Sequence, residues 1–400
     1  MKNYAGTLLV LLALVFSCTA RATEVMVVSD THYMAANLYA DSELFIRSLR
    51  AGDGKYTQHS DELMAALCAE VERIMPDALI VTGDLTLNGE RDSHIALANW
   101  FSRIEALGVP VWIIPGNHDI NVKSARGFDT DGWYYTETVT PEQFAAIYAD
   151  YMLPAEGGAN LSYAVQVDDR LWIALTDVAY YSGEAQTFGL FTAGHAEWLE
   201  SVLQRAGDVE VLTATHQNLL EHTAFSRDSF LMFGHETMAS LAARYGVRLN
   251  LSGHMHAQNI VEQGGLTDAA LGAFCNWPHR YALVTLEENG DMTYEASSLD
   301  AALLPEAFLE DSRTWFEEIT REKTALAIAD IAAEDRDAMA QYVTRFNLAY
   351  FSGTYSRDDA SWTEDPGWQL WQAHQGNIFW KYLNLVMREA SGDNLYRHWN

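Results

Sequence analysis

The stretch Val111-Trp-Ile-Ile-Pro-Gly-Asn-His-Asp119 joins an apolar run to a group of polar residues that can bind metal ions. A short apolar run bounded by a turn signal is typical of a buried strand, so we expect a strand over 111–115 that ends at the glycine. Two earlier runs have the same form: Glu24–Ser29 leads into Asp30-Thr-His32, and Ala78–Thr82 leads into Gly83-Asp84. Because ligands gather outside the carboxyl ends of strands in α/β sheets, these three loops are predicted to meet at one site.

Two later loops repeat the pattern. Val209–Ala214 runs into His216, and Arg248–Leu251 runs into Gly253-His-Met-His256. Amphipathic helices are expected between the strands, over Ser60–Ile74, Arg91–Leu107 and Ala193–Arg205. A hairpin is expected from Ser162–Val167 and Leu171–Thr176, which indicates mixed sheets. The alternation of strands and helices predicts a layered α/β architecture.

The residue types in these loops suit two adjacent cations. Aspartate and histidine supply hard oxygen and borderline nitrogen donors, which fit Mn, Fe or Zn. In Asp30-x-His32 and His254-x-His256, an extended backbone would point both side chains of a pair the same way. Asp84 is the candidate to bridge the cations. Two divalent ions against the carboxylates of Asp30 and Asp84 leave a positive site that can attract phosphate.

The five-block order D-x-H, G-D, G-N-H-D, H, G-H-x-H resembles the metallophosphoesterase (calcineurin-like phosphoesterase) superfamily over Val25 to Asn259. Singly, each block has an ordinary explanation, such as an aspartate N-cap or a glycine turn, but those explanations do not predict the order. The resemblance implies a four-layer sandwich of two mixed β-sheets flanked by helices. One departure is His216-Gln217-Asn218, where many members have a second histidine and then proline.

The resemblance also implies the roles of the site residues. One metal would be held by Asp30, His32, Asp84 and His256, and the other by Asp84, Asn117, His216 and His254. His118 would be the catalytic residue that acts on the substrate, with Asp119 as its partner. In this family chemistry a metal-bridging hydroxide attacks phosphorus in line, and His118 protonates the leaving oxygen.

A closer resemblance is to secreted bacterial cyclic nucleotide phosphodiesterases that carry a C-terminal helical domain. It rests on Gly83–Glu90, Gly116–Asn121, Asn218–His222 and a helical extension of about a hundred residues. We therefore expect hydrolysis of a phosphodiester, with a cyclic nucleotide as substrate. The alternatives are a phosphomonoesterase or nucleotidase, a glycerophospho- or sphingomyelin-type phosphodiesterase, and a non-enzymatic surface binding protein.

Composition limits the partners. The formal net charge of -30 over 400 residues disfavours a nucleic-acid polymer, because no counterion release is available to drive binding. A small phosphoester remains compatible, since bound metals reverse the local field. The oligomeric state is left open by the sequence.

The N-terminus predicts export. Residues 1–22 have Lys2, an apolar run over Leu8–Phe16 and a small-x-small site at Ala20-Arg-Ala22, as in a signal peptide. The protein is therefore expected to be secreted or in the cell envelope. Lipid anchoring through Cys18 is the alternative, and it would be the only route to a membrane. The remaining cysteines, Cys68 and Cys275, are expected to be buried free thiols.

The chain is expected to divide after the signal peptide into a metallophosphoesterase domain, 23–300, and a helical C-terminal domain, 301–400. The latter contains Trp362, Trp368, Trp371 and Trp380, which are interpreted as core aromatics rather than as a stacking surface for a ligand. Weaker candidates for substrate contact or for the rim of the site are Asn88, His94, Asn121, Arg126 and His222. Arg126 stands out as a possible phosphate clamp.

Overall fold

The computed structural model describes residues 21–400 apart from 40, 41, 156, 158, 184, 226 and 389–391. Nearly all of the expected signal peptide, and Cys18 with it, lies outside the described residues, so export remains a prediction. Within the described part of the chain, no helix has the length and apolar character needed to cross a membrane. Cys68 and Cys275 are both free, as expected, although only Cys275 is fully buried.

The first sheet has six strands in the order β16-β15-β14-β1-β2-β3. Their bounds are β1 Thr23–Val28, β2 Ala78–Thr82, β3 Val111–Ile114, β14 Arg280–Leu286, β15 Met292–Ser298 and β16 Tyr396–Trp399. The pairs β1·β2 and β2·β3 are parallel, whereas β14, β15 and β16 continue the sheet in antiparallel fashion. All five residues of β2 are buried apolar or threonine side chains, as expected of a strand covered on both faces.

The second sheet also has six strands, in the order β12-β13-β11-β10-β7-β6. Their bounds are β6 Tyr163–Gln166, β7 Leu171–Leu175, β10 Glu210–Ala214, β11 Leu249–Ser252, β12 Asn259–Gln263 and β13 Leu266–Ala270. The expected hairpin is present as the antiparallel pair β6·β7, so both sheets are mixed. Two short hairpins lie outside them: β4 Arg126–Phe128 with β5 Trp133–Tyr135, and β8 Ala179–Tyr181 with β9 Ala185–Gly189.

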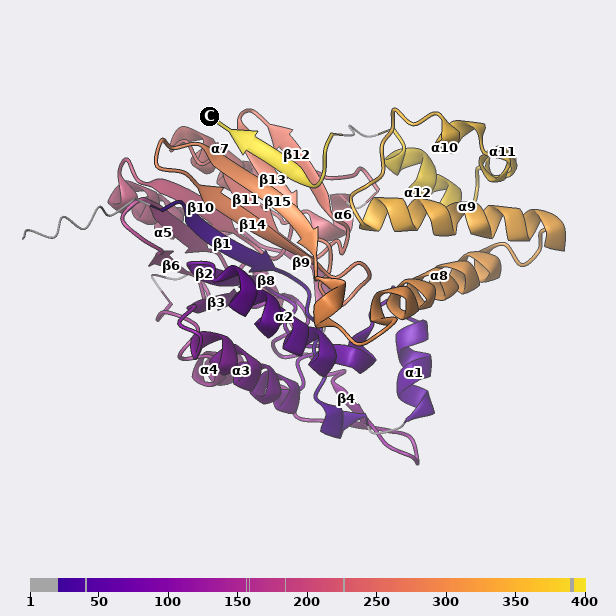
Figure 1. The fold of residues 1–400 in the computed structure, drawn as a ribbon, viewed down its shortest axis with the longest axis horizontal. Coiled ribbons are helices and arrows are strands. Elements are labelled where there is room, and N and C mark those ends of the chain that lie inside the picture. The colour runs from indigo at the N-terminus through magenta and orange to yellow at the C-terminus, as the bar shows by residue number, and fades with distance from the viewer. Residues whose placement is uncertain are drawn as a thin grey trace, which may run out of the picture.

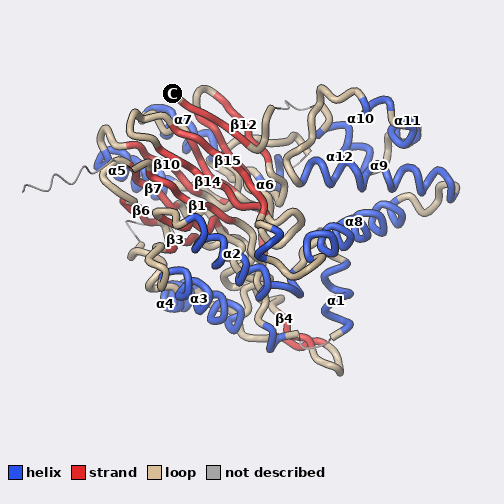
Figure 2. The backbone as a smooth tube through the Cα atoms, in the orientation of Figure 1, coloured by secondary structure: helices blue, strands red, loops and turns tan. Residues whose placement is uncertain are grey.

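The packing gives four layers. Helices of the first two thirds are α1 Glu43–Arg50, α2 Ser60–Ile74, α3 Arg91–Glu105, α4 Pro141–Ile147, α5 Ala193–Ala206, α6 Arg227–Phe230 and α7 His235–Arg244. Along β10, Leu212 and Ala214 join the core shared with the first sheet and α2, whereas Val211 joins a second core with α5 and α7. Each sheet is thus packed against the other sheet on one face and against helices on the other face, which confirms the predicted sandwich (Figures 1 and 2).

The helical region follows the sandwich and packs beside it (Figure 1). It contains α8 Phe308–Ala327, α9 Ala333–Phe351, α10 Ser361–Glu364, α11 Pro366–Gln372 and α12 Ile378–Val386. Trp362, Trp368 and Trp371 are buried in one core here, and Trp380 packs against it, so the interpretation as core aromatics is confirmed.

The last strand departs from the sequence analysis. Residues 396–399, expected within the helical domain, form β16 and pair with β15 at the edge of the first sheet. The segment is only four residues long and has no apolar run, so its strand character depends on pairing with β15 and gives no local signal.

Candidate dimetal site

The loops that follow β1, β2, β3, β10 and β11 meet where the two sheets adjoin. Among the described residues, two groups of histidine and aspartate side chains have ligand atoms within 4.8 Å of one another. The first group is Asp30, His32, Asp84 and His256, and the second is Asp84, His216 and His254. All six side chains are buried, and Asp84 belongs to both groups.

In the first group, ring nitrogens and carboxylate oxygens face a common point. Nε2 of His32 lies 3.1 Å from Nε2 of His256 and 3.5 Å from Oδ2 of Asp84. Nε2 of His256 lies 3.3 Å from Oδ1 of Asp30. Two imidazole nitrogens directed at each other beside two carboxylates form a donor set suited to a cation.

The second group continues from the same Asp84 oxygen. Nε2 of His216 lies 3.3 Å from Oδ2 of Asp84 and 3.1 Å from Oδ1 of Asn117. The rings of His216 and His254 are 4.9 Å apart, edge to face. The structure therefore brings together all seven residues that the resemblance assigned to metals, with Asp84 between the two groups.

The local backbone is not the extended one that we expected for the D-x-H and H-x-H pairs. Asp30 and His32 have φ of 55° and 37°, and His254 and His256 have φ of 69° and 60°. Among described non-glycine residues, ten have positive φ, and five of them are these four residues and Asp84. A left-handed backbone is costly for such residues and persists where the surroundings impose it, as at functional sites. The pairs converge through turns, so the extended geometry was wrong.

Hydrogen bonds between the sheets hold the loops in register. The backbone N–H of His254 donates to Oδ2 of Asp30 at 3.0 Å, and Nδ1 of His216 donates to the carbonyl of Thr82 at 2.8 Å. Gly253 is needed for this approach, because a Cβ atom there would lie 1.9 Å from Oγ of Ser29. The glycine thus allows the ends of β1 and β11 to lie close together.

The chemistry of the donor set fits cations. Although burial raises it, the charges of His216 and then His118 hold the pKa of Asp84 well below its usual value, so the carboxylate is ionised. Burial lowers the pKa of His254 to about 3, which leaves a neutral ring able to bind metal. Among the described residues, Oδ1 of Asp30 and Nδ2 of Asn117 are buried without a hydrogen-bond partner. A buried carboxylate oxygen without a hydrogen-bond partner, such as this Oδ1 of Asp30, is explained if it binds a metal ion.

The sequence matches two family models. Residues 23–258 match the calcineurin-like phosphoesterase model, which covers more than half of the chain. The chain belongs to the calcineurin-like phosphoesterase family. Residues 297–393 match a second model, described as the C-terminal domain of cyclic nucleotide phosphodiesterase, and they correspond to the helical region.

Individual relatives are distant. A probable glycerophosphodiester phosphodiesterase of Arcobacter nitrofigilis is 26% identical over 186 residues, 45% of this chain and 57% of the relative. A probable cyclic nucleotide phosphodiesterase of Synechococcus is 26% identical over 203 residues, 51% of this chain and 66% of the relative. The matches thus span less than two thirds of either relative. A dimetal phosphatase of Danio rerio shares the fold, with a TM-score of 0.52, 15% identity, and coverage of 70% of this chain and 96% of that one.

His118 lies beside the group of expected metal ligands, with its ring 5.1 Å from the ring of His32. Its Nδ1 lies 2.9 Å from the carbonyl oxygen of Leu87 and 3.1 Å from Oδ1 of Asn88. Because a carbonyl only accepts, Nδ1 carries the hydrogen in this contact, and Nε2 is the ring atom left to meet a substrate. Asn88, a weak candidate from sequence, therefore orients His118.

Asp119 has a different role from the predicted one. Its carboxylate accepts from the backbone N–H groups of Gly116, Leu85 and Thr86 at 2.7, 3.0 and 2.9 Å. The expected partnership with the His118 ring is thus wrong, because Nδ1 of His118 contacts Leu87 and Asn88 instead. Asp119 instead fastens the loop after β2 to the loop after β3, and these loops carry Asp84 and Asn117.

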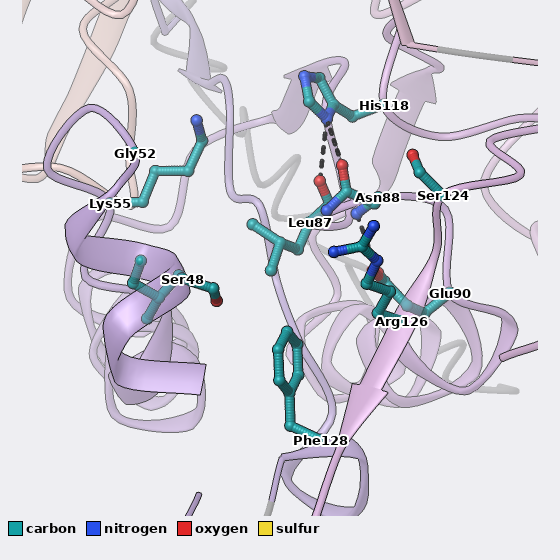
Figure 3. A pocket seen from close by; sticks show the side chains of 11 residues that line it. Ser48, Gly52, Lys55, Leu87, Asn88, Glu90, His118, Ser124, Arg126 and Phe128 are labelled. Atoms are coloured by element: carbon teal, nitrogen blue, oxygen red, sulfur yellow. Dashed lines mark hydrogen bonds between the residues drawn. The ribbon is translucent and has the colours of Figure 1, made fainter. Parts of the chain in front are cut away.

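A pocket of about 340 Å³ opens beside His118. Figure 3 shows Arg126, Asn88 and Glu90 on one wall, Lys55 on another, and Phe128 at the far end. Arg126, the predicted phosphate clamp, lines the pocket and stacks over Trp133 with its guanidinium 4.1 Å from the ring.

The remaining weak candidates have other roles. His94 is buried, 3.0 Å from the hydroxyl of Tyr148 and 2.9 Å from the carbonyl of Asp119. His222 is buried, with Nε2 3.2 Å from Asp268. Asn121 has a left-handed backbone, with φ of 58°, and donates its N–H to the Val139 carbonyl. These three are explained as structural residues.

Sequence reasoning missed Asp53, Lys55 and Glu90. Nδ1 of His256 lies 2.6 Å from Oδ2 of Asp53, and Lys55 and Glu90 line the pocket. Glu90 falls inside a stretch used for the resemblance, Gly83–Glu90, which was a signal not followed further. Asp53 and Lys55 lie in a segment that carries no motif.

Proposed function

We propose that this protein is a metal-dependent phosphodiesterase that hydrolyses a small phosphodiester, with a cyclic nucleotide as substrate. The observation that carries the proposal is the position of Asp84, a buried carboxylate shared by two groups of ligands. Its Oδ1 accepts from the backbone N–H of His118 at 2.8 Å, and His118 lines the pocket. Two cations that share a carboxylate are the arrangement used for in-line displacement at phosphorus.

The residues fit two cations in the predicted division. Asp30, His32, Asp84 and His256 would hold one ion, and Asp84, Asn117, His216 and His254 the other. When bound, such ions lower the pKa of water and neutralise charge on the phosphoryl group. The donor set suits Mn, Fe and Zn, and elemental analysis of the purified protein distinguishes them.

His118 supplies the proton to the leaving oxygen in this proposal. Its ring is fixed by the Leu87 carbonyl and the Asn88 side chain, so Nε2 keeps one direction. A positioned acid of this kind contributes about 10²–10⁴-fold to the rate. Arg126 is placed to contact the part of the substrate that does not react, because it lines the same pocket as His118.

The substrate class is supported by two comparisons and by the size of the pocket. The helical region matches the model named for cyclic nucleotide phosphodiesterases, and one relative carries that name. The pocket volume of about 340 Å³ is in the range of small-molecule sites. The net charge of -30 further disfavours a polymeric nucleic acid.

The second candidate is a glycerophosphodiester, favoured by the Arcobacter relative. Phosphomonoesters and sphingomyelin-type diesters use the same chemistry. The non-enzymatic alternative is disfavoured, because each expected ligand is in place and buried.

Turnover of a substrate panel tests the proposal. The metal-loaded protein is assayed with 3′,5′-cyclic AMP, a 2′,3′-cyclic nucleotide, a glycerophosphodiester and an aryl monophosphate in Mn²⁺. We expect the cyclic nucleotides to be turned over fastest, and cleavage of the monoester alone would contradict a diesterase. Asp84→Ala should abolish turnover and lower bound metal, and unchanged activity in that variant would end the metal assignment.

Export belongs to the same proposal. We infer that residues 1–22 are removed on secretion, with lipidation of Cys18 as the alternative. Mass spectrometry of the protein expressed from its full gene distinguishes cleavage after residue 22 from a lipid-modified cysteine.

A further inference from the structure

The segment between α1 and α2 brings two charged side chains to the metal cluster. Nζ of Lys55 lies 2.7 Å from Oδ1 of Asp53, and the other carboxylate oxygen of Asp53 lies 2.6 Å from Nδ1 of His256. Because the ring donates through Nδ1, its Nε2 is left to face Asp30 and His32. A carboxylate on the distal nitrogen of a ligating histidine fixes its tautomer and orientation.

The backbone of this segment is anchored on several sides. Nε1 of Trp315, on α8, donates to the carbonyl of Lys55 at 3.0 Å. Nδ2 of Asn276 donates to the carbonyl of Asp53 at 3.1 Å, and the N–H of Tyr56 donates to the carbonyl of Cys275 at 2.9 Å. The first helix of the C-terminal region thus helps to hold the loop that carries the two charges.

The end of α1 is held against α8 as well. Nη1 of Arg50 lies 3.1 Å from Glu318, and Nη2 pairs with Glu322. Figure 1 shows α8 running close to α1 at this point. Side chains on a loop fixed in this way lose little conformational entropy when a ligand binds.

Lys55 is directed into the substrate pocket. Its side chain is 14% exposed, and it lines the same pocket as His118, with its amine at the same end in Figure 3. An ammonium has three donors, and the ion pair with Asp53 uses one. The chain has only 25 Lys and Arg residues against 55 acidic ones, so a cation here is unlike the general surface.

We propose that Lys55 is a substrate-binding residue that contacts a phosphoryl oxygen of the substrate, and that Asp53 positions both Lys55 and the ligand His256. The inference rests on the phosphodiesterase function proposed above. A lysine ammonium is a compact point charge suited to phosphate, and Lys55 would contact the phosphoryl group in addition to any bound cations.

Phosphate binding tests Lys55 separately from turnover. Inorganic phosphate is titrated calorimetrically into the metal-loaded protein, the Lys55→Gln variant and the matched Lys123→Gln variant, whose lysine is exposed and lies outside the pocket lining. We expect Lys55→Gln to weaken phosphate binding about tenfold with unchanged metal content, and Lys123→Gln to bind like the wild type. In diester hydrolysis, Lys55→Gln should raise KM more than it lowers kcat.

Asp53→Ala gives a second readout. Loss of a carboxylate that orients a ligand histidine typically lowers metal affinity 10–100-fold, so this variant should lose metal at concentrations where Lys55→Gln retains it. Equal retention of metal would contradict the positioning role of Asp53.

The outcomes separate the two proposals. Phosphate affinity unchanged in Lys55→Gln, or no phosphate binding by the metal-loaded wild type, overturns the role of Lys55. A wild type that hydrolyses no diester overturns the proposed function, while the calorimetric comparison still decides on Lys55.

Discussion

Gly116 packs directly against the carboxylate of Asp84. A Cβ atom at residue 116 would lie 2.2 Å from Oδ1 of Asp84 and 2.3 Å from its backbone nitrogen. The same Oδ1 accepts from the N–H of His118 at 2.8 Å. The glycine therefore sets the position of the shared carboxylate relative to the loop that carries His118.

Gly116→Ala should displace Asp84, because one of the atoms that the methyl group meets is backbone and cannot swing away. We expect a loss of phosphoesterase activity of about a hundredfold or more, together with reduced bound metal, measured by elemental analysis. Gly376→Ala is the matched control, since no atom lies within 4 Å of a Cβ there. Full activity of Gly116→Ala would show that the carboxylate position is not critical.

His118→Ala should spare the metals and slow the chemistry. The ring donates to Leu87 and touches no carboxylate of the cluster in the described structure, so bound metal is expected to stay at the wild-type level. Turnover should fall about a hundredfold or more for an alkyl leaving group. With p-nitrophenolate, which leaves without a proton, the loss should be much smaller. An equal loss for both leaving groups would contradict the role of general acid.

Asp119→Ala should mainly lower the stability of the protein. The carboxylate is fully buried and serves three backbone N–H groups, and each group left without an acceptor costs about 1–3 kcal/mol. We expect a clear fall in the free energy of unfolding, measured by urea denaturation of the metal-free protein. The exposed Asp131→Ala is the control and should change stability by less than about 0.5 kcal/mol. An unchanged free energy of unfolding in Asp119→Ala would contradict the role of Asp119 in fastening the loop after β2 to the loop after β3.

Glu90→Gln should stabilise the protein at alkaline pH. Burial, opposed by backbone hydrogen bonds, raises the pKa of Glu90 from 4.5 to about 7. A folded state with the higher pKa binds the proton more tightly, so wild-type stability falls as pH rises from about 4.5 to 7. The glutamine side chain cannot ionise and so avoids the cost of a buried charge. The free energy of unfolding of Glu90→Gln should exceed that of the wild type by about 1–3 kcal/mol at pH 8 and equal it at pH 4. If the free energies of unfolding of the two proteins change with pH in parallel, the raised pKa of Glu90 is excluded.

Much of the site could be predicted because its signals are local. Strands such as Ala78–Thr82 have continuous apolar runs, and the ligands follow them within a few residues. The parallel strands β1 and β2 end at the same edge of one sheet, so Asp30 and Asp84 could be predicted to lie close together. The helical region was likewise visible as a change of pattern after residue 300.

Other features could not be predicted because they depend on distant contacts. Lys55 reaches the pocket on a loop held by Trp315, 260 residues away, and no motif marks either residue. The direction of Asp119 depends on which N–H groups surround it, and β16 forms only because β15 offers an edge.

Local sequence specifies the kinds of atoms available, the strands that carry them and the family to which they point. Long-range packing specifies which of those atoms face one another: the left-handed turns at Asp30 and His256, the approach of Gly253 to Ser29, and the link from Lys55 through Asp53 to His256. Strand propensity and residue chemistry depend on neighbours within a few residues along the chain. A contact between the two sheets, such as the 3.0 Å hydrogen bond from His254 to Asp30, depends instead on how the cores of the sheets pack.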